Sequence, residues 1–407
     1  MPRKDASNIS RRSFLTVATA TVSALGTGVG TWSVRPADAA QGEAVRVGVA
    51  TDLTGVLGFA GTADANVARL LVKQINDAGG LLGRPVELYV EDTASDEATA
   101  VVAARKLVMQ HKVHVVLGGI LSSTRVSMRD VIAGRGKGLY IYPQLYEGGE
   151  CTPYVYCTGP TPAQQCDTLI PWLIANGGKR FALPGANFLW PRKINEYARV
   201  KIQEHGGEVV FEEYHTPDQT EFGATVSRIL SEKVNVVFNT ISPPGVGAFF
   251  KQLHQAGFNA NGGRLSCAYY DENMLGMNRP EEIEGLANCL DYFRAVADED
   301  SVSGEIQKAY DNAFPGGALL SAGSAATGTY RGLMLWAKAV QKVGKTDREA
   351  VAEAIDNASI DKAPGGPAGM VPGSRHCEMR MYIASAENGS YKIRQRSDGL
   401  VAPRQCT

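Results

Sequence analysis

Aromatic, amide and hydroxyl side chains gather around a short apolar strand predicted at residues 139–142. Tyr142, Gln144 and Tyr146 lie at or just beyond its carboxyl end. Because ligands of α/β proteins sit at the carboxyl ends of parallel strands, these side chains suit the binding of a small molecule. The segment 139–161 is therefore predicted to form the floor of a binding cleft. A tyrosine-rich hairpin on an ordinary sheet edge would explain the same residues.

Residue types that could support catalysis do not form a known constellation. Val343-Gly-Lys-Thr346 resembles the end of a phosphate-binding loop, but the first glycine of that motif would fall at Ala339, inside a predicted helix. No serine lies in a Gly-x-Ser-x-Gly motif, and the 6 histidines are scattered rather than spaced for a metal. An amidase would need a base beside a nucleophile, and we can place neither. We therefore expect a protein that is not an enzyme and that uses no cofactor and no metal.

The amino-terminal residues predict export. Ser10-Arg11-Arg12-Ser13 precedes a weakly apolar run that ends near Ala37-Asp38-Ala39, which is typical of a twin-arginine signal peptide over residues 1–39. The run is too short to span a bilayer well, because a spanning helix needs about 20 apolar residues. We expect a mature chain that is located in the periplasm and is not embedded in the membrane.

Charge and cysteine content narrow the class of protein further. The formal net charge of −1 gives no indication of a nucleic-acid partner. The 7 cysteines suit an oxidising compartment, and their odd number leaves at least one thiol unpaired. Cys151 and Cys157 flank a short loop that a disulfide between them could close, although connectivity cannot be deduced from sequence.

Strands and helices alternate along two stretches, residues 45–117 and 162–268. The order predicts α/β units with parallel strands and right-handed crossovers. A Pro/Gly-rich junction separates the units, so we expect two lobes that face each other across a groove. Helices return after the second unit, and a hairpin around Glu387-Asn-Gly-Ser390 follows, so the chain should cross between the lobes more than once and form a hinge. The predicted lobes are residues 44–158 with 290–370, and residues 159–289 with 371–400.

Four segments carry motifs of a known family: Val47–Gly55 with residues 75–85 and 91–95, Gly118–Arg125, Tyr142–Gly148 leading into residues 156–165, and Gly185–Arg192. The chain resembles the periplasmic solute-binding proteins of ABC transporters with the leucine-binding, or type I, fold. The last two segments are similar to signatures of the branch that binds urea and short-chain amides. The resemblance implies two Rossmann-like lobes, a multi-crossing hinge and a ligand in the cleft between the lobes.

The resemblance also implies which residues meet the ligand. Ser122 matches a serine that contacts the ligand amide, and Phe188 matches an aromatic residue, often Tyr, that covers the ligand from the second lobe. Gln144 stands where the relatives have Thr, a change in both size and hydrogen bonding. The implied ligand-binding residues are Ser122, Ser123, Tyr142, Gln144, Tyr146, Phe188, Asn239, Thr240 and Tyr270.

Hydroxyl and amide groups among aromatic walls suit a neutral solute such as urea or a short-chain amide. An amino acid would instead require an anion for its ammonium, which Glu147, Asp271 or Glu272 could supply. Ser122 could equally cap a helix, and Phe188 could be ordinary packing between lobes.

These observations predict a solute-binding component of an ABC importer that delivers a small polar solute to a membrane permease. A branched-chain or other amino acid is the alternative ligand. A ligand-sensing regulator with the same fold is a further alternative, and the predicted export signal argues against it.

Overall fold

The structure, a computed structural model, describes residues 42–321 and 324–406. The predicted twin-arginine signal lies outside these residues. Among the described residues, no helix has both the length and the apolar character that crossing a membrane requires.

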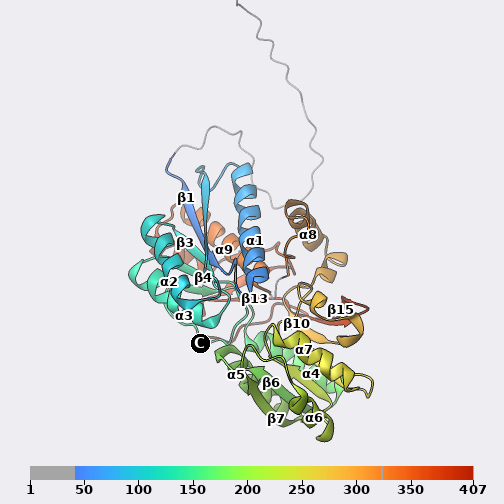
Figure 1. The fold of residues 1–407 in the computed structure, drawn as a ribbon. Coiled ribbons are helices and arrows are strands. Elements are labelled where there is room, and N and C mark those ends of the chain that lie inside the picture. The colour runs from blue at the N-terminus through green and yellow to red at the C-terminus, as the bar shows by residue number, and fades with distance from the viewer. Residues whose placement is uncertain (1–41, 322–323, 407) are drawn as a thin grey trace, which may run out of the picture. The chain divides into compact units, whose positions relative to one another are not determined.

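Two sheets organise the chain (Figure 1). The first has eight strands in the order β11-β12-β13-β5-β4-β3-β1-β2 and the second has seven in the order β15-β14-β10-β9-β8-β6-β7. The strands of the first sheet, in chain order, are β1 (Val45–Thr51), β2 (Val86–Asp92), β3 (Val115–Gly118), β4 (Leu139–Tyr142), β5 (Val155–Cys157), β11 (Ser359–Ile360), β12 (Ala368–Val371) and β13 (His376–Met379). Those of the second are β6 (Arg180–Ala186), β7 (Glu208–His215), β8 (Val236–Asn239), β9 (Arg264–Cys267), β10 (Ala287–Leu290), β14 (Tyr382–Glu387) and β15 (Ser390–Arg396).

Helices connect the parallel strands, as the β-α-β order predicts. The α-helices are α1 (Gly58–Asp77), α2 (Glu97–Arg105), α3 (Ser122–Arg129), α4 (Pro162–Gly177), α5 (Leu189–Glu204), α6 (Gly223–Ser231), α7 (Gly245–Gln255), α8 (Ser301–Ala313), α9 (Ala325–Val343) and α10 (Arg348–Ile355). Short helical turns are η1 (Lys106–Gln110), η2 (Asp130–Arg135), η3 (Leu275–Met277), η4 (Pro280–Glu282) and η5 (Arg294–Asp298).

Local sequence explains several boundaries of these elements. Helix α4 begins with a capping box, in which the side chains of Thr161 and Gln164 each accept a hydrogen bond from the other residue's backbone N–H. Pro162 occupies the first turn of this helix. The predicted hairpin is present between β14 and β15. Its turn residues Asn388 and Gly389 both have positive φ, 49° and 77°, which suits a two-residue hairpin loop.

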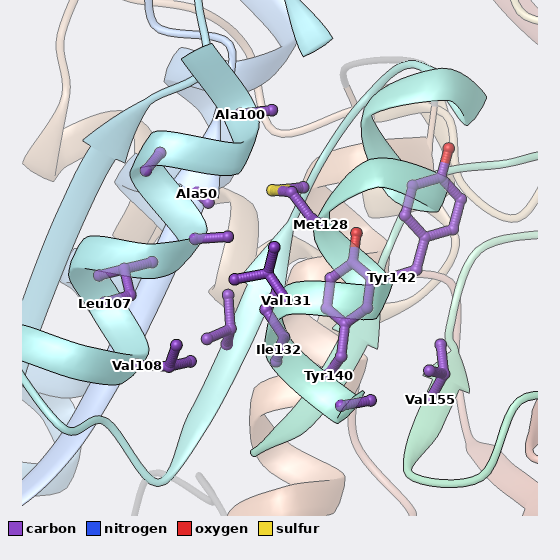
Figure 2. Packing of buried hydrophobic residues seen from close by; sticks show 14 of the residues in the cluster. Ala50, Ala100, Leu107, Val108, Met128, Val131, Ile132, Tyr140, Tyr142 and Val155 are labelled. Carbon is purple, nitrogen blue, oxygen red and sulfur yellow. The ribbon is translucent and has the colours of Figure 1, made fainter. Parts of the chain in front are cut away.

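Both faces of the first sheet are covered. Alternate side chains such as Val116 and Tyr140 pack with α2, α3 and the helical turns that follow them, in a cluster that Figure 2 shows from close by. Leu117 and Ile141 point the other way, toward Gly332 of α9, where a Cβ atom would lie 2.6 Å from Ile141. The carboxyl ends of the strands are left for the loops that carry the polar residues.

Between β1 and β15 the described chain passes between the sheets three times: after β5, after β10 and after β13. Arg331 of α9 is almost fully buried and joins two of these crossings. Its Nη1 lies 2.5 Å from the Asp291 carboxylate just after β10, and its Nε and Nη2 donate to the Thr158 carbonyl just after β5. The expectation of more than one crossing is therefore confirmed.

One predicted lobe boundary is wrong. Residues 371–400 were assigned to the second lobe, yet β13 pairs with β5 in the first sheet. His376 and Cys377 are fully buried there, so this strand completes the first sheet before the chain crosses to β14.

Candidate ligand-binding site

A pocket that is partly open to solvent, with about 630 Å³ of empty space when the solvent at its open side is included, is lined by loops and helix starts from both sheets. Its lining residues follow the carboxyl ends of β1, β3 and β4 in the first sheet and of β6, β8 and β9 in the second. Of the described residues that line it, most are apolar or aromatic and none carries a charged side chain: Leu57, Phe59, Ala60, Ile120, Leu121, Ser122, Gln144, Leu145, Phe188, Trp190, Ser242, Pro243, Tyr269 and Met274. The pocket therefore suits a small ligand with an apolar body.

Four of the described helices, α1, α3, α5 and α7, begin at this pocket because they follow the strands that end there. None of the four has a side-chain hydrogen bond capping its first turn. Helices α2, α8 and α10 begin elsewhere and do have such caps, and α4 begins elsewhere with a capping box, whereas α6 and α9 have no such cap. The amino-terminal ends of helices carry partial positive charge and favour an anion.

Two polar groups in the pocket wall lack partners within the described part of the chain. The indole Nε1 of Trp190 and the Oε1 of Gln144 are buried and make no hydrogen bond there. Buried polar groups are normally paired, because an unpaired one costs about 1–3 kcal/mol. A bound ligand that supplies an acceptor and a donor would remove that cost.

Behind the pocket wall lies a buried ionic network. Ser122 Oγ donates to Glu147 Oε2 at 2.5 Å, and Arg125 Nη2 donates to Glu147 Oε1 at 2.9 Å. Arg125 Nε and Arg129 Nη1 each lie 3.3 Å from Glu150 Oε2. Burial acts to raise the pKa of the Glu150 carboxyl, but a hydrogen bond from Thr152 and the charge of Arg125 outweigh this effect. The pKa therefore lies below its ordinary value. The network holds the start of α3 against the loop after β4.

Three of the nine predicted ligand-binding residues line the pocket: Ser122, Gln144 and Phe188. They come from different loops, after β3, β4 and β6, and the fold brings them together. Ser123 is exposed and does not line the pocket.

Three others are buried one layer behind the wall, where they hold backbone of the lining loops. Tyr142 donates to the carbonyl of Ile120 at 2.8 Å, and Tyr270 donates to the carbonyl of Met274 at 2.7 Å. Asn239 Nδ2 donates to the carbonyl of Ile241 at 3.4 Å. We therefore interpret these three as supports of the pocket.

Tyr146 and Thr240 are also buried away from the pocket. The Tyr146 hydroxyl hydrogen-bonds to Nε2 of His376, whose pKa burial lowers to about 4, so that this imidazole is neutral near pH 7. Thr240 donates to Oδ1 of Asn195 at 3.1 Å. Both residues tie neighbouring segments together.

Several lining residues were not among the predicted ligand contacts. Tyr269 and Ser242 follow β9 and β8 directly, so the rule that ligands lie at strand ends could have identified them. Trp190 packs edge-on against Tyr269, with ring centroids 5.6 Å apart. This aromatic pair joins the first turn of α5 to the loop after β9, and only the three-dimensional fold reveals it.

The predicted disulfide between Cys151 and Cys157 is wrong. Cys151 is bonded to Cys406, 255 positions away in the sequence. Cys157 lies fully buried in strand β5, where its side chain joins the core cluster, whereas Cys151 is exposed on the preceding loop. Spacing alone could not reveal that the carboxyl terminus returns to this loop.

Comparison with known proteins places the chain in a family. A family model described as periplasmic binding protein matches residues 44–390. The chain belongs to the periplasmic binding protein family. Leu/Ile/Val-binding protein BraC3 of Rhizobium johnstonii is 28% identical over 221 residues, which are 53% of this chain and 59% of BraC3. This periplasmic binding protein thus matches little more than half the length of that relative.

Two further matches extend over most of the periplasmic binding protein. A leucine-, isoleucine-, valine-, threonine- and alanine-binding protein of Pseudomonas aeruginosa is 25% identical over 343 residues, covering 80% of this chain and 86% of that protein. A solute-binding protein of an ABC transporter from Rhodopseudomonas palustris, solved with 3,4-dihydroxybenzoic acid, has a TM-score of 0.77 at 22% identity and covers 88% of this chain and 99% of that one. The second match shows that the type I fold is shared. The narrower assignment to the urea and amide branch stays a prediction.

Proposed function

We propose that this protein is the solute-binding component of an ABC importer and that its ligand is a small carboxylate with an apolar body. The observation that carries the ligand class is the convergence of four uncapped helix starts on a pocket whose walls are largely apolar. A carboxylate would accept hydrogen bonds at those helix ends, and the aromatic walls would exclude water from its apolar body.

The relatives support the same class of ligand. Branched-chain amino acids and dihydroxybenzoic acid, which appear in the names of proteins similar to this chain, all join a carboxyl group to an apolar body. In the proposed transport role, the loaded protein delivers this solute to a membrane permease.

The neutral amide or urea remains the second candidate. It is favoured by the absence of charged side chains among the described residues that line the pocket, and by the unpaired donor of Trp190 and acceptor of Gln144, which an amide group could satisfy together. A urea-sized molecule would leave much of the apolar wall unfilled, so we place the carboxylate first.

A thermal-shift experiment with matched pairs separates the two candidates. Benzoate and benzamide share one shape, as do 4-methylpentanoate and 4-methylpentanamide, and members of each pair differ in charge; leucine and urea complete the panel. A ligand at about 100 times its Kd adds roughly 2.7 kcal/mol to the free energy of unfolding. We expect carboxylates to raise the melting temperature and their amides not to. Stabilisation by amides or urea alone would reject the carboxylate proposal.

A further inference from the structure

Glu147 is positioned to control the hydrogen-bonding character of the pocket without touching it. Its side chain is only 5% exposed and does not line the pocket. One carboxylate oxygen accepts from Ser122 and the other accepts from Arg125. Ser122 itself lines the pocket.

A serine hydroxyl has one proton to donate and two lone pairs that accept. In this structure the hydroxyl of Ser122 donates its proton to Glu147. The distance from Ser122 Oγ to Glu147 Oε2 is 2.5 Å, which is typical of a charge-assisted O–H···O⁻ hydrogen bond. Toward the pocket, Ser122 Oγ can therefore only accept. The ligand atom that meets it must carry a hydrogen.

The pocket has the opposite hydrogen-bonding character at Trp190, in the first turn of α5, which follows β6 of the other sheet. The indole N–H there has no hydrogen-bond partner among the described residues, and it can meet only an acceptor on the ligand. A ligand that satisfies both positions carries an acceptor and, separately, a donor. A plain carboxylate supplies the acceptor alone.

We propose that Glu147, acting through Ser122, makes the pocket selective for carboxylates that carry a second, hydrogen-bond-donating group, either an ammonium or a hydroxyl. Amino acids and hydroxylated acids then bind more tightly than the corresponding plain acids. This inference rests on the proposed function and narrows its class of ligand. Glu147 is a positioning residue in this scheme, and Ser122 is the residue that meets the ligand.

The test is titration calorimetry of the mature chain with two matched pairs. Leucine is compared with 4-methylpentanoate, which lacks the ammonium, and 4-hydroxybenzoate with benzoate, which lacks the hydroxyl. In at least one pair, the donor-bearing member should bind at least tenfold more tightly. The pair in which this happens identifies the donor as ammonium or hydroxyl.

Glu147→Gln then reverses the polarity at Ser122. The amide oxygen can still accept from Arg125 while the amide nitrogen donates to Ser122, which frees the serine proton to point into the pocket. The affinity ratio within the pair should fall to about twofold or less. Ser122→Ala removes the acceptor altogether and should reduce the ratio in the same way, which keeps the test valid if the Glu147 variant does not fold.

Glu150→Gln is the matched control. Glu150 belongs to the same buried network and pairs with Arg125, but the hydroxyl of Ser122 donates to Glu147 and not to Glu150. This variant should lower the melting temperature while keeping the affinity ratio. Two results would overturn this inference and leave the proposed function standing. One is equal affinity of the unmodified protein for both members of each pair. The other is a fall of the affinity ratio in Glu150→Gln as large as that in Glu147→Gln. Failure of every carboxylate to bind would overturn the proposed function, and the inference with it.

Discussion

The indole N–H of Trp190 is buried without a partner in the described part of the chain, in a side chain that is 8% exposed and lines the pocket. Trp190→Phe removes this donor and keeps an aromatic ring. We expect ligand affinity to fall about fivefold to tenfold, because one hydrogen bond contributes about 1 kcal/mol. Any fall in the stability of the unliganded protein should come only from the packing that the smaller ring loses against Tyr269, since no internal hydrogen bond is lost. Calorimetry and urea unfolding measure the two quantities.

Trp172→Phe provides the control for that substitution. Trp172 lies on α4, under the guanidinium of Arg264, and does not line the pocket. Its replacement should leave ligand affinity unchanged. If Trp190→Phe binds the ligand as tightly as the unmodified protein, the indole N–H does not take part in recognition.

At this scale, the sequence predicted the correct loops more often than the correct side chains. Tyr270 was predicted as a ligand contact, but its neighbour Tyr269 lines the pocket while Tyr270 supports Met274 from behind. Successive residues at a strand end point in different directions, and the twist of the sheet decides which of them faces the ligand. A sequence pattern places the strand end and leaves that choice open.

Helix α1 is tied to two other elements through one buried carboxyl group. Asp64 accepts hydrogen bonds from Thr51 at the end of β1 and from Thr329 of α9, each at 3.0 Å. Burial is the main cause that raises the pKa of Asp64 to about 7, although the two hydroxyls act in the opposite direction. The helix packing on this face of the first sheet therefore depends on pH.

The sign of that dependence follows from proton linkage. The pKa of Asp64 is higher in the folded state than its ordinary value of 3.8, so the folded protein binds more protons than the unfolded chain between pH 4 and 7. The stabilising contribution of Asp64 is complete below about pH 4 and is lost as the pH rises toward 7. At about 1.4 kcal/mol per pKa unit, the loss amounts to a few kcal/mol.

Asp64→Asn should remove this contribution to the pH dependence. Unfolding free energies measured in urea at pH 4.5 and pH 7 should differ less for the variant than for the unmodified protein. Asp77→Asn, at an exposed aspartate on the same helix, serves as the control and should keep the original difference. An unchanged pH dependence in Asp64→Asn would show that Asp64 does not titrate in this range.

Element prediction succeeded for the alternating strands and helices of the β-α units and failed for short strands outside them. Helices such as α1 and α5 show helical spacing of apolar residues over 16 or more positions, and the parallel strands alternate with them. Strands β11, β12 and β13 have 2 to 4 residues each and were not predicted. So few residues carry no distinguishable period when no helix alternates with them, and the pairing of β13 with β5 is decided by the rest of the sheet.

Over the whole molecule, the three crossings are joined by contacts between residues that are distant in the sequence. Arg331 joins the segments after β5 and β10 from within α9. The carboxyl-terminal residues cross back as well: Thr161 donates to the carbonyl of Pro403, and Gln164 donates to that of Val401. Sequence patterns predicted the number of lobes. They could not predict these contacts, which form only because the carboxyl-terminal segment folds back toward residues far earlier in the chain.

The disulfide between Cys151 and Cys406 completes that return path. It fixes the carboxyl terminus to the loop that carries Glu147 and Glu150, whose side chains hold the start of α3. Because the bond closes a loop with a sequence separation of 255, it strongly restricts the unfolded chain. Removing a disulfide of this kind costs about 2–5 kcal/mol. The double variant Cys151→Ser/Cys406→Ser should lose that amount in urea unfolding.

Reduction of the unmodified protein should produce the same loss, and a reductant should have no effect on the double variant, because the other five described cysteines are buried and unbonded. A non-reducing digest should yield a cross-linked peptide pair containing Cys151 and Cys406. A cross-link from Cys151 to Cys157 would instead restore the pairing suggested by loop spacing. It would also leave the carboxyl terminus unattached, so that Cys406→Ser alone would not lower the stability of the protein. The digest and the unfolding experiment therefore test the same long-range connection by independent means.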